Sequence, residues 1–236
     1  MREKKIDILL DSVIMSEIEK YSWIIKGVTT TPTFFKREGI NYDEFIENFR
    51  KTYPNLEIHV EALGQTVEKT EKEIQNIMNQ EWFDRDKVVL KIPVSFENLR
   101  LVQKYAKDGI RFNVHLVFTA NQASVATMVS ADYVCPLIGR YADTMSSKSG
   151  KNLHGGNTCA GSELLKDVRS AIEYVRPESE TKVMASSIRT VGDYYTAIMN
   201  RADVVTVPTK VMDVLLDHEM TKQGVETFLR DMGYEI

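Results

Sequence analysis

The sequence predicts an α/β protein whose residues 1–236 form one domain, a single (β/α)8 TIM barrel with an additional C-terminal helix. Three observations support this prediction. Short apolar segments typical of buried parallel strands alternate about eight times with segments of helical periodicity. The length of 236 residues is near that of one such barrel, and no linker rich in proline, glycine and serine divides the chain. A doubly wound open sheet is the alternative, but it rarely uses so many regular units in this length.

The expected strands are short and apolar, and most of them run into a polar residue. In chain order they are residues 6–11, 27–32, 57–63, 87–94, 111–118, 133–139, 182–188 and 204–208. Because the carboxyl ends of all barrel strands meet at one face, the polar residues at these ends are expected to lie together there.

Segments with helical spacing follow the strands, and each carries apolar residues on one face. Ser95 is a candidate N-cap, and Gly109 is a candidate stop for the helix that Ser95 begins. Residues 143–162 are polar and glycine-rich, so we expect a long irregular loop there, either plain surface or a lid. The expected helices are residues 13–25, 41–53, 66–80, 95–109, 119–131, 159–175, 190–202, 209–220 and 225–236.

Composition excludes several classes of protein. A net charge of −4 gives no reason to expect a nucleic-acid partner. Cys135 and Cys159 form neither a CxxC pair nor a zinc-binding pattern, which predicts a reducing compartment without a disulfide framework or metal site. No apolar run is long enough to span a bilayer, and the apolar stretch near the N-terminus is too short for a signal peptide. We therefore expect a cytoplasmic protein with no membrane partner.

The polar residues at the expected strand ends are of types that perform catalysis or bind anions. They comprise two acids, a lysine, a histidine, an arginine and several hydroxyl groups. The candidate site residues are Asp11, Thr29, Thr31, Glu61, Lys91, His115, Arg140 and Ser187.

Lys91 suggests the chemistry, because a lysine among apolar residues favours the neutral amine. A neutral amine condenses with a ketone to form a Schiff base, and the resulting iminium withdraws electrons so that a neighbouring carbon–carbon bond can break. Asp11 and Glu61 are candidates for the proton transfers that this reaction needs. Arg140 and Ser187 together suit a substrate phosphate.

Six segments, taken in order, resemble the small-subunit transaldolase family, which includes fructose 6-phosphate aldolase. They are ILLD, GVTTTP, VVLKIPV, ANQ, ADYVCPLIGR and KVMASSIR. The resemblance implies a (β/α)8 barrel with its Schiff-base lysine at Lys91 and no metal or organic cofactor. It further implies that Asp11 handles protons at the substrate carbinol, that Glu61 acts as acid/base through a bound water, and that Arg140 and Ser187 bind phosphate.

Two positions depart from the family pattern. The family usually reads GVTTNP, and its asparagine contacts substrate hydroxyls, whereas this chain has Thr31. The family usually has a threonine on strand five that holds the catalytic water, whereas this chain has His115, which is able to act as acid/base itself. These differences concern the donor sugar and the proton relay. Glu61 favours a transaldolase, because the aldolase branch typically has glutamine there.

The expected function is therefore that of a transaldolase in carbohydrate metabolism. It would transfer a dihydroxyacetone unit between sugar phosphates, interconverting sedoheptulose 7-phosphate and glyceraldehyde 3-phosphate with erythrose 4-phosphate and fructose 6-phosphate. One alternative is a fructose 6-phosphate aldolase-like enzyme with an altered donor, and another is a non-catalytic barrel that binds sugar phosphates. The resemblance also implies a homo-oligomer, a pentamer or decamer, in which the C-terminal segment reaches a neighbour.

Overall fold

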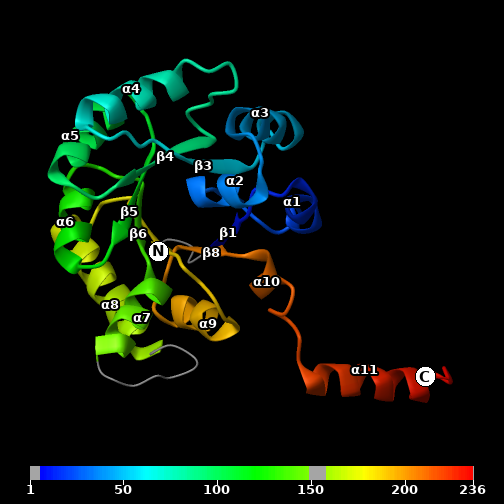
Figure 1. Cartoon of the computed structure of the whole chain (residues 1–236). Coiled ribbons are helices and arrows are strands. Elements are labelled where there is room, and N and C mark those ends of the chain that lie inside the picture. The colour runs from blue at the N-terminus through cyan, green and yellow to red at the C-terminus, as the bar shows by residue number, and fades with distance from the viewer. Residues whose placement is uncertain (1–5, 149–157, 236) are drawn as a thin grey trace.

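The computed structural model describes residues 6–148 and 158–235, and it confirms the predicted barrel. Eight parallel strands close in chain order, with β8 paired to β1 (Figure 1). The strands are β1 Asp7–Asp11, β2 Gly27–Thr29, β3 Glu57–Glu61, β4 Val88–Pro93, β5 Phe112–Val117, β6 Tyr133–Pro136, β7 Lys182–Ala185 and β8 Val204–Val207.

Helices surround the barrel and cover the outer faces of its strands (Figure 1). In chain order they are α1 Met15–Tyr21, α2 Pro32–Glu38, α3 Tyr42–Thr52, α4 Val67–Met78, α5 Phe96–Ala106, α6 Ala120–Met128, α7 Ile138–Lys148, α8 Thr158–Val175, α9 Val191–Met199, α10 Thr209–Met212 and α11 Glu219–Asp231. The N-cap expected for α5 is present, because the Ser95 side chain accepts a hydrogen bond from the Asn98 amide, whereas the C-cap is Lys107 and not Gly109. Gly109 follows α5 in the left-handed conformation, with φ +77°.

Alternation along each strand separates the interior of the barrel from the core beneath the helices. On β3, Ile58 and Val60 belong to the core that the helices cover. Glu57, His59 and Glu61 point the other way, into the barrel, where they contact residues of β4, β5 and β6. The barrel interior is therefore unusually polar along this strand.

Two helices, α2 and α7, occupy segments in which no helix was expected. The prediction of an irregular loop over 143–162 is wrong at both ends, since α7 continues to Lys148 and α8 begins at Thr158. Ile138 and Ala142 are buried one turn apart on α7, and Gly161 of α8 lets the two helices approach closely. Residues 149–157, the middle of the expected loop, lie outside the described residues.

The C-terminal end also differs from the expected pattern. The helix expected over 209–220 stops after α10, and a new helix, α11, begins at Glu219. None of the residues of α11 is buried, and the helix projects away from the barrel (Figure 1). No helix within residues 6–148 and 158–235 has the length and apolar character needed to cross a membrane.

Candidate active site

A cavity of about 470 Å³ opens at the carboxyl ends of the barrel strands. This is the face where polar strand ends meet in such a barrel. All eight candidate site residues line the cavity, namely Asp11, Thr29, Thr31, Glu61, Lys91, His115, Arg140 and Ser187. The structure thus brings together residues from seven different strand–helix units.

Lys91 lies at the centre of the polar residues and is only 5% exposed. It follows Leu90 on β4, and its strand neighbour on β3 is Glu61. The ammonium nitrogen Nζ donates a hydrogen bond of 2.6 Å to the carbonyl oxygen of Thr30. The same nitrogen lies 3.5 Å from Oε2 of Glu61. The lysine therefore has a carboxylate beside it, as expected for two polar residues at the ends of neighbouring strands.

Glu61 also contacts His115, whose Nε2 lies 2.7 Å from the carboxylate oxygen Oε1. Burial acts to raise the pKa of Glu61, but the hydrogen bond from His115 and the charge of Lys91 outweigh it and lower that pKa. Burial lowers the pKa of His115. The pair is therefore an ionised carboxylate that accepts a hydrogen bond from a neutral imidazole.

A bulge in β5 follows His115 and turns the next residue, Leu116, into the cavity. The pairing of β5 with β6 shifts register between Val114 and Val117, and Leu116 has a φ of +58°. Consecutive residues of a regular strand point to opposite faces, yet His115 and Leu116 both line the cavity. A β-bulge re-aims side chains in this way. No feature of the sequence predicts the bulge.

Asp11 ends β1 and lines the same cavity. Burial raises the pKa of its carboxyl to about 6, although the charges of Lys91 and Arg37 act in the opposite direction. Asp11 does not cap the helix that follows, because the N-cap position of α1 is Ile14. A carboxyl with this pKa exchanges protons near neutral pH, as a general acid/base must.

Arg140 and Ser187 also line the cavity. Gly139 packs so closely on the loop after β7 that a Cβ there would lie 2.1 Å from the Ser187 carbonyl oxygen. Arg140 is exposed and has no carboxylate partner among the described residues, because Asp143 pairs with Arg189 instead. The guanidinium of Arg140 is thus available to an anion.

The remaining cavity wall mixes hydroxyl groups with apolar side chains. Thr31 occupies the N-cap position of α2, yet its side chain makes no capping hydrogen bond, so its hydroxyl is free to face the cavity. Thr206 also lines the cavity and could have been found from the alternation in β8. The other lining residues outside the predicted set are Pro32, Thr33, Phe34, Leu63, Leu116, Cys135, Leu137 and Ser186.

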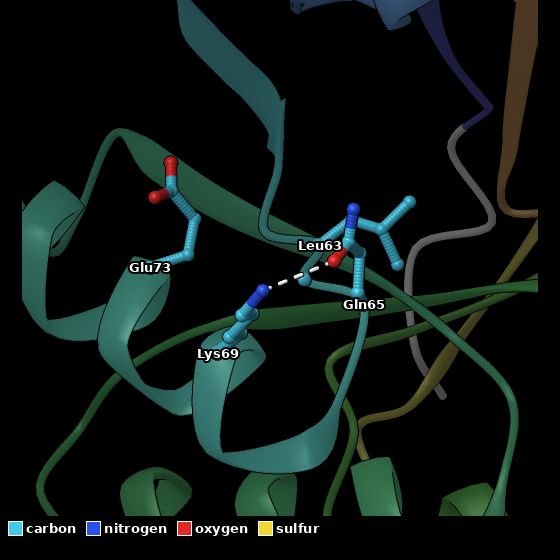
Figure 2. Close-up of a pocket in the computed structure, with 5 residues that line it drawn as sticks. Leu63, Gln65, Lys69 and Glu73 are labelled. Atoms are coloured by element: carbon cyan, nitrogen blue, oxygen red, sulfur yellow. Dashed lines mark hydrogen bonds between the residues drawn. The ribbon is translucent and has the colours of Figure 1, made fainter.

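A second, open hollow adjoins the cavity and shares Leu63 with it. It lies between the loop after β3 and the first turns of α4. Figure 2 shows the Lys69 side chain reaching Gln65, whose Oε1 accepts its hydrogen bond at 3.0 Å, with Glu73 one turn further along α4. These contacts are satisfied locally, so this hollow forms the rim of the site.

The fold and the site define the chain as a (β/α)8-barrel protein with a lysine and two carboxylates in the cavity at the carboxyl ends of its strands. Residues 8–233 match the family model described as transaldolase/fructose-6-phosphate aldolase, and the chain belongs to this family. It is 33% identical over 226 residues to a "Probable transaldolase" of Caldicellulosiruptor saccharolyticus, with 95% of each chain covered. A "Probable transaldolase" of Alkaliphilus metalliredigens is also 33% identical, with 95% of this chain and 96% of the relative covered. The chain is thus a transaldolase-type enzyme.

Proposed function

We propose that the chain transfers a dihydroxyacetone unit between sugar phosphates through a Schiff base on Lys91. The observation that carries this proposal is the grouping around the lysine. Its Nζ lies 3.5 Å from Glu61, and Asp11, Arg140 and Ser187 line the same cavity. This set supplies a nucleophile, two proton carriers and an anion site, which together meet the needs of aldol cleavage on a phosphorylated ketose.

The reaction begins when the Lys91 amine adds to the ketose carbonyl and water leaves, which produces an iminium. Asp11 then accepts the proton of the hydroxyl group beside the bond that breaks. The electron pair of that bond moves toward the iminium, an aldehyde leaves, and an enamine stays on Lys91. The enamine then attacks a second aldehyde, and Asp11 returns the proton to the new hydroxyl group. Water hydrolyses the resulting iminium, which releases the new ketose and the Lys91 amine.

Arg140 and Ser187 hold the phosphate in this scheme. A guanidinium without a carboxylate partner and a neighbouring hydroxyl suit a phosphate group. The distance between this end of the cavity and Lys91 sets the length of the sugar, because the phosphate and the ketone must be held at the same time. Thr29 and Thr31 line the wall and are candidates for contacts with the sugar hydroxyls.

Acceptor dependence tests this function. Fructose 6-phosphate and erythrose 4-phosphate are incubated with the protein, and sedoheptulose 7-phosphate and glyceraldehyde 3-phosphate are measured. A transaldolase gives both products much faster than it releases dihydroxyacetone when the acceptor is left out. Equal rates with and without erythrose 4-phosphate would exclude transfer.

A second candidate is an aldolase that releases the three-carbon ketone instead of transferring it. Thr31 favours this alternative, since its hydroxyl faces the cavity without the donor groups of an amide. In that case dihydroxyacetone is the product in the assay above. A non-catalytic binder is excluded if wild-type turnover exists and is lost in Lys91→Met.

The exposed helix α11 supports a further proposal, that the chain assembles with copies of itself. Large apolar side chains on and beside α11 are exposed, including Leu216 at 90%, Met220 at 74% and Phe228 at 69%. A patch of this kind is typical of an interface, and the family resemblance points to a pentamer or decamer. Light scattering of the wild type and of a Phe228→Ser variant tests it, since the variant is expected to have a smaller mass. An unchanged monomer mass for both would overturn it.

A further inference from the structure

Glu61 bridges the lysine and the histidine through its two oxygens. Oε2 lies 3.5 Å from Nζ of Lys91, and Oε1 lies 2.7 Å from Nε2 of His115. Each oxygen therefore has a different nitrogen as its neighbour. Because Nε2 of His115 donates its hydrogen bond to Glu61, Nδ1 is the nitrogen of this imidazole that can accept a further proton.

His115 differs from an ordinary buried histidine in its access to the cavity. Its side chain is 13% exposed and lines the cavity, and its Nδ1 has no hydrogen-bond partner among the described residues. His59 on β3, by contrast, is 0% exposed, packs its ring edge-on against Tyr133 and lies outside the cavity. The imidazole of His115 is thus the one of these two that substrate can reach.

The alternation of β5 already points His115 into the barrel, because Asn113, two residues earlier, contacts His59 there. The strained residue comes next: Leu116 is not a glycine, yet it has a φ of +58°. Strain of this kind clusters at functional sites, where the surrounding structure maintains it.

We propose that His115 is a catalytic residue that carries the proton during formation of the Schiff base on Lys91, while Glu61 accepts the hydrogen bond from its Nε2 and stabilises the charged imidazole. This proposal rests on the proposed function. A lysine attacks a carbonyl only as the free amine, so an ammonium at Lys91 first gives up one proton, which His115 accepts at Nδ1.

The remaining steps return that proton. Lys91 adds to the ketone, and the proton that its nitrogen loses moves to the former carbonyl oxygen to give a neutral carbinolamine. His115 then donates its extra proton to the hydroxyl group of the carbinolamine. The carbon–oxygen bond breaks, water leaves, and the nitrogen lone pair forms the carbon–nitrogen double bond. One water is released, the positive charge now lies on the iminium, and His115 and Glu61 return to their starting state.

Dihydroxyacetone separates this step from carbon–carbon cleavage, because it forms the iminium but has no aldehyde to lose. The protein is mixed with dihydroxyacetone and quenched at increasing times with excess borohydride, and the intact mass gives the fraction of modified chains. We expect His115→Gln to slow modification by about 100-fold, the scale of proton-transfer catalysis. Glutamine keeps a hydrogen-bond donor for Glu61 but cannot carry the proton.

His59→Gln is the matched control, because it makes the same substitution inside the barrel but outside the cavity. This variant is expected to form the dihydroxyacetone adduct at the wild-type rate. As a second test, His115→Ala is expected to be slow and to recover in part when imidazole is added. The wild-type rate is also expected to depend on pH through the titration of His115, and His115→Gln is expected to lose that dependence.

Wild-type modification rates in His115→Gln would overturn the proposal and leave His115 as a residue that only positions Glu61. Failure of imidazole to accelerate a slow, folded His115→Ala would also count against it. If the wild type itself forms no adduct with any ketose, the proposed function is wrong. A wild type that forms the adduct and a His115→Gln variant that forms it equally fast would overturn only the role of His115, so the two outcomes are distinguishable.

Discussion

The barrel interior contains two pairs of a glutamate and a histidine, one above the other. The lower pair, Glu57 and His59, comes from the beginning and middle of β3. The upper pair consists of Glu61, at the end of the same strand, and His115. Both pairs are largely buried, with glutamates that are 5% and 8% exposed. Their residue types are the same, but their neighbours differ.

The lower pair is surrounded by an arginine and a tyrosine, neither of which releases its proton near neutral pH. Glu57 accepts hydrogen bonds from Arg111 at 2.8 Å and from the Tyr133 hydroxyl at 2.9 Å. Burial opposes ionisation of Glu57, but His59 and Arg111 outweigh it and hold the pKa of this carboxyl well below its usual range. Arginine does not deprotonate in proteins, and burial raises the pKa of Tyr133. The lower pair is thus a fixed structural charge.

The upper pair has a lysine in the place of the arginine and opens onto the cavity. A lysine can lose its proton and act as a nucleophile, whereas an arginine cannot. A buried acid and a buried histidine therefore do not by themselves make an active site. The type of the neighbouring cation and the access of substrate determine whether such a pair has a structural or a catalytic role.

Replacement of Lys91, the cation of the upper pair, is expected to have the largest effect on turnover. Lys91→Met should lower turnover by more than about 1,000-fold, since no other group can form the covalent intermediate. The control is Lys87→Met, because Lys87 lies just before the same strand and its ammonium group donates a hydrogen bond to the Asn55 carbonyl, away from the cavity. Steady-state turnover of both variants measures the difference. Equal activity in the two variants would remove Lys91 from the mechanism.

Loss of the lower cation should instead reduce stability. Arg111→Met leaves the Glu57 carboxylate buried without its ion pair, which we expect to cost about 3 kcal/mol of unfolding free energy. Adding Glu57→Gln should restore part of this loss. Arg85→Met, at an exposed arginine bound to the Asp108 carbonyl, should change stability by less than about 0.5 kcal/mol. Urea denaturation measures all three, and a neutral Arg111→Met would contradict the structural assignment.

Asp11 links stability to activity in the upper region. Its folded pKa of about 6 exceeds the ordinary 3.8, so the folded state binds this proton more tightly than the unfolded state. The protein therefore loses stability as the pH rises from about 4 to about 6. The rate of donor cleavage, which needs the ionised carboxylate, decreases when the pH is lowered below about 6. Asp11→Asn should raise the free energy of unfolding by on the order of 2 kcal/mol at pH 8 and leave it unchanged at pH 4. The same substitution should lower the rate of donor cleavage by about 100-fold. Denaturation at both pH values checks the gain; a variant less stable than wild type at pH 8 would refute it.

The smallest expected effect concerns the phosphate end of the cavity. Arg140→Gln should raise KM for fructose 6-phosphate by about 10- to 100-fold, the value of one charge-assisted hydrogen bond. Borohydride trapping with dihydroxyacetone, which has no phosphate, is the internal control and should be unaffected. Equal losses with both compounds would mean that Arg140 maintains the shape of the cavity rather than binding phosphate.

The sequence predicted the barrel and the location of the cavity, because both follow from local patterns. Apolar runs mark the strands, and a polar residue such as Lys91 or Asp11 at the end of a run marks the face where they meet. The place of Leu116 in the cavity wall was not predictable, since it depends on a bulge in β5. Helix α7 was missed because its polar residues resemble a loop, whereas its stability comes from packing Ile138 against Gly161 of α8.

Borohydride trapping with fructose 6-phosphate shows directly whether Lys91 forms a Schiff base with the donor sugar. The protein is incubated with the sugar and reduced, and the masses of the intact chain and, after digestion, of the peptide that contains Lys91 are measured. We expect a reduced three-carbon adduct on Lys91, which demonstrates both the Schiff base and cleavage of the donor. A six-carbon adduct would show binding to the lysine without cleavage. A chain that carries no adduct on Lys91 after incubation with this and other ketose phosphates would exclude Schiff-base chemistry at this residue.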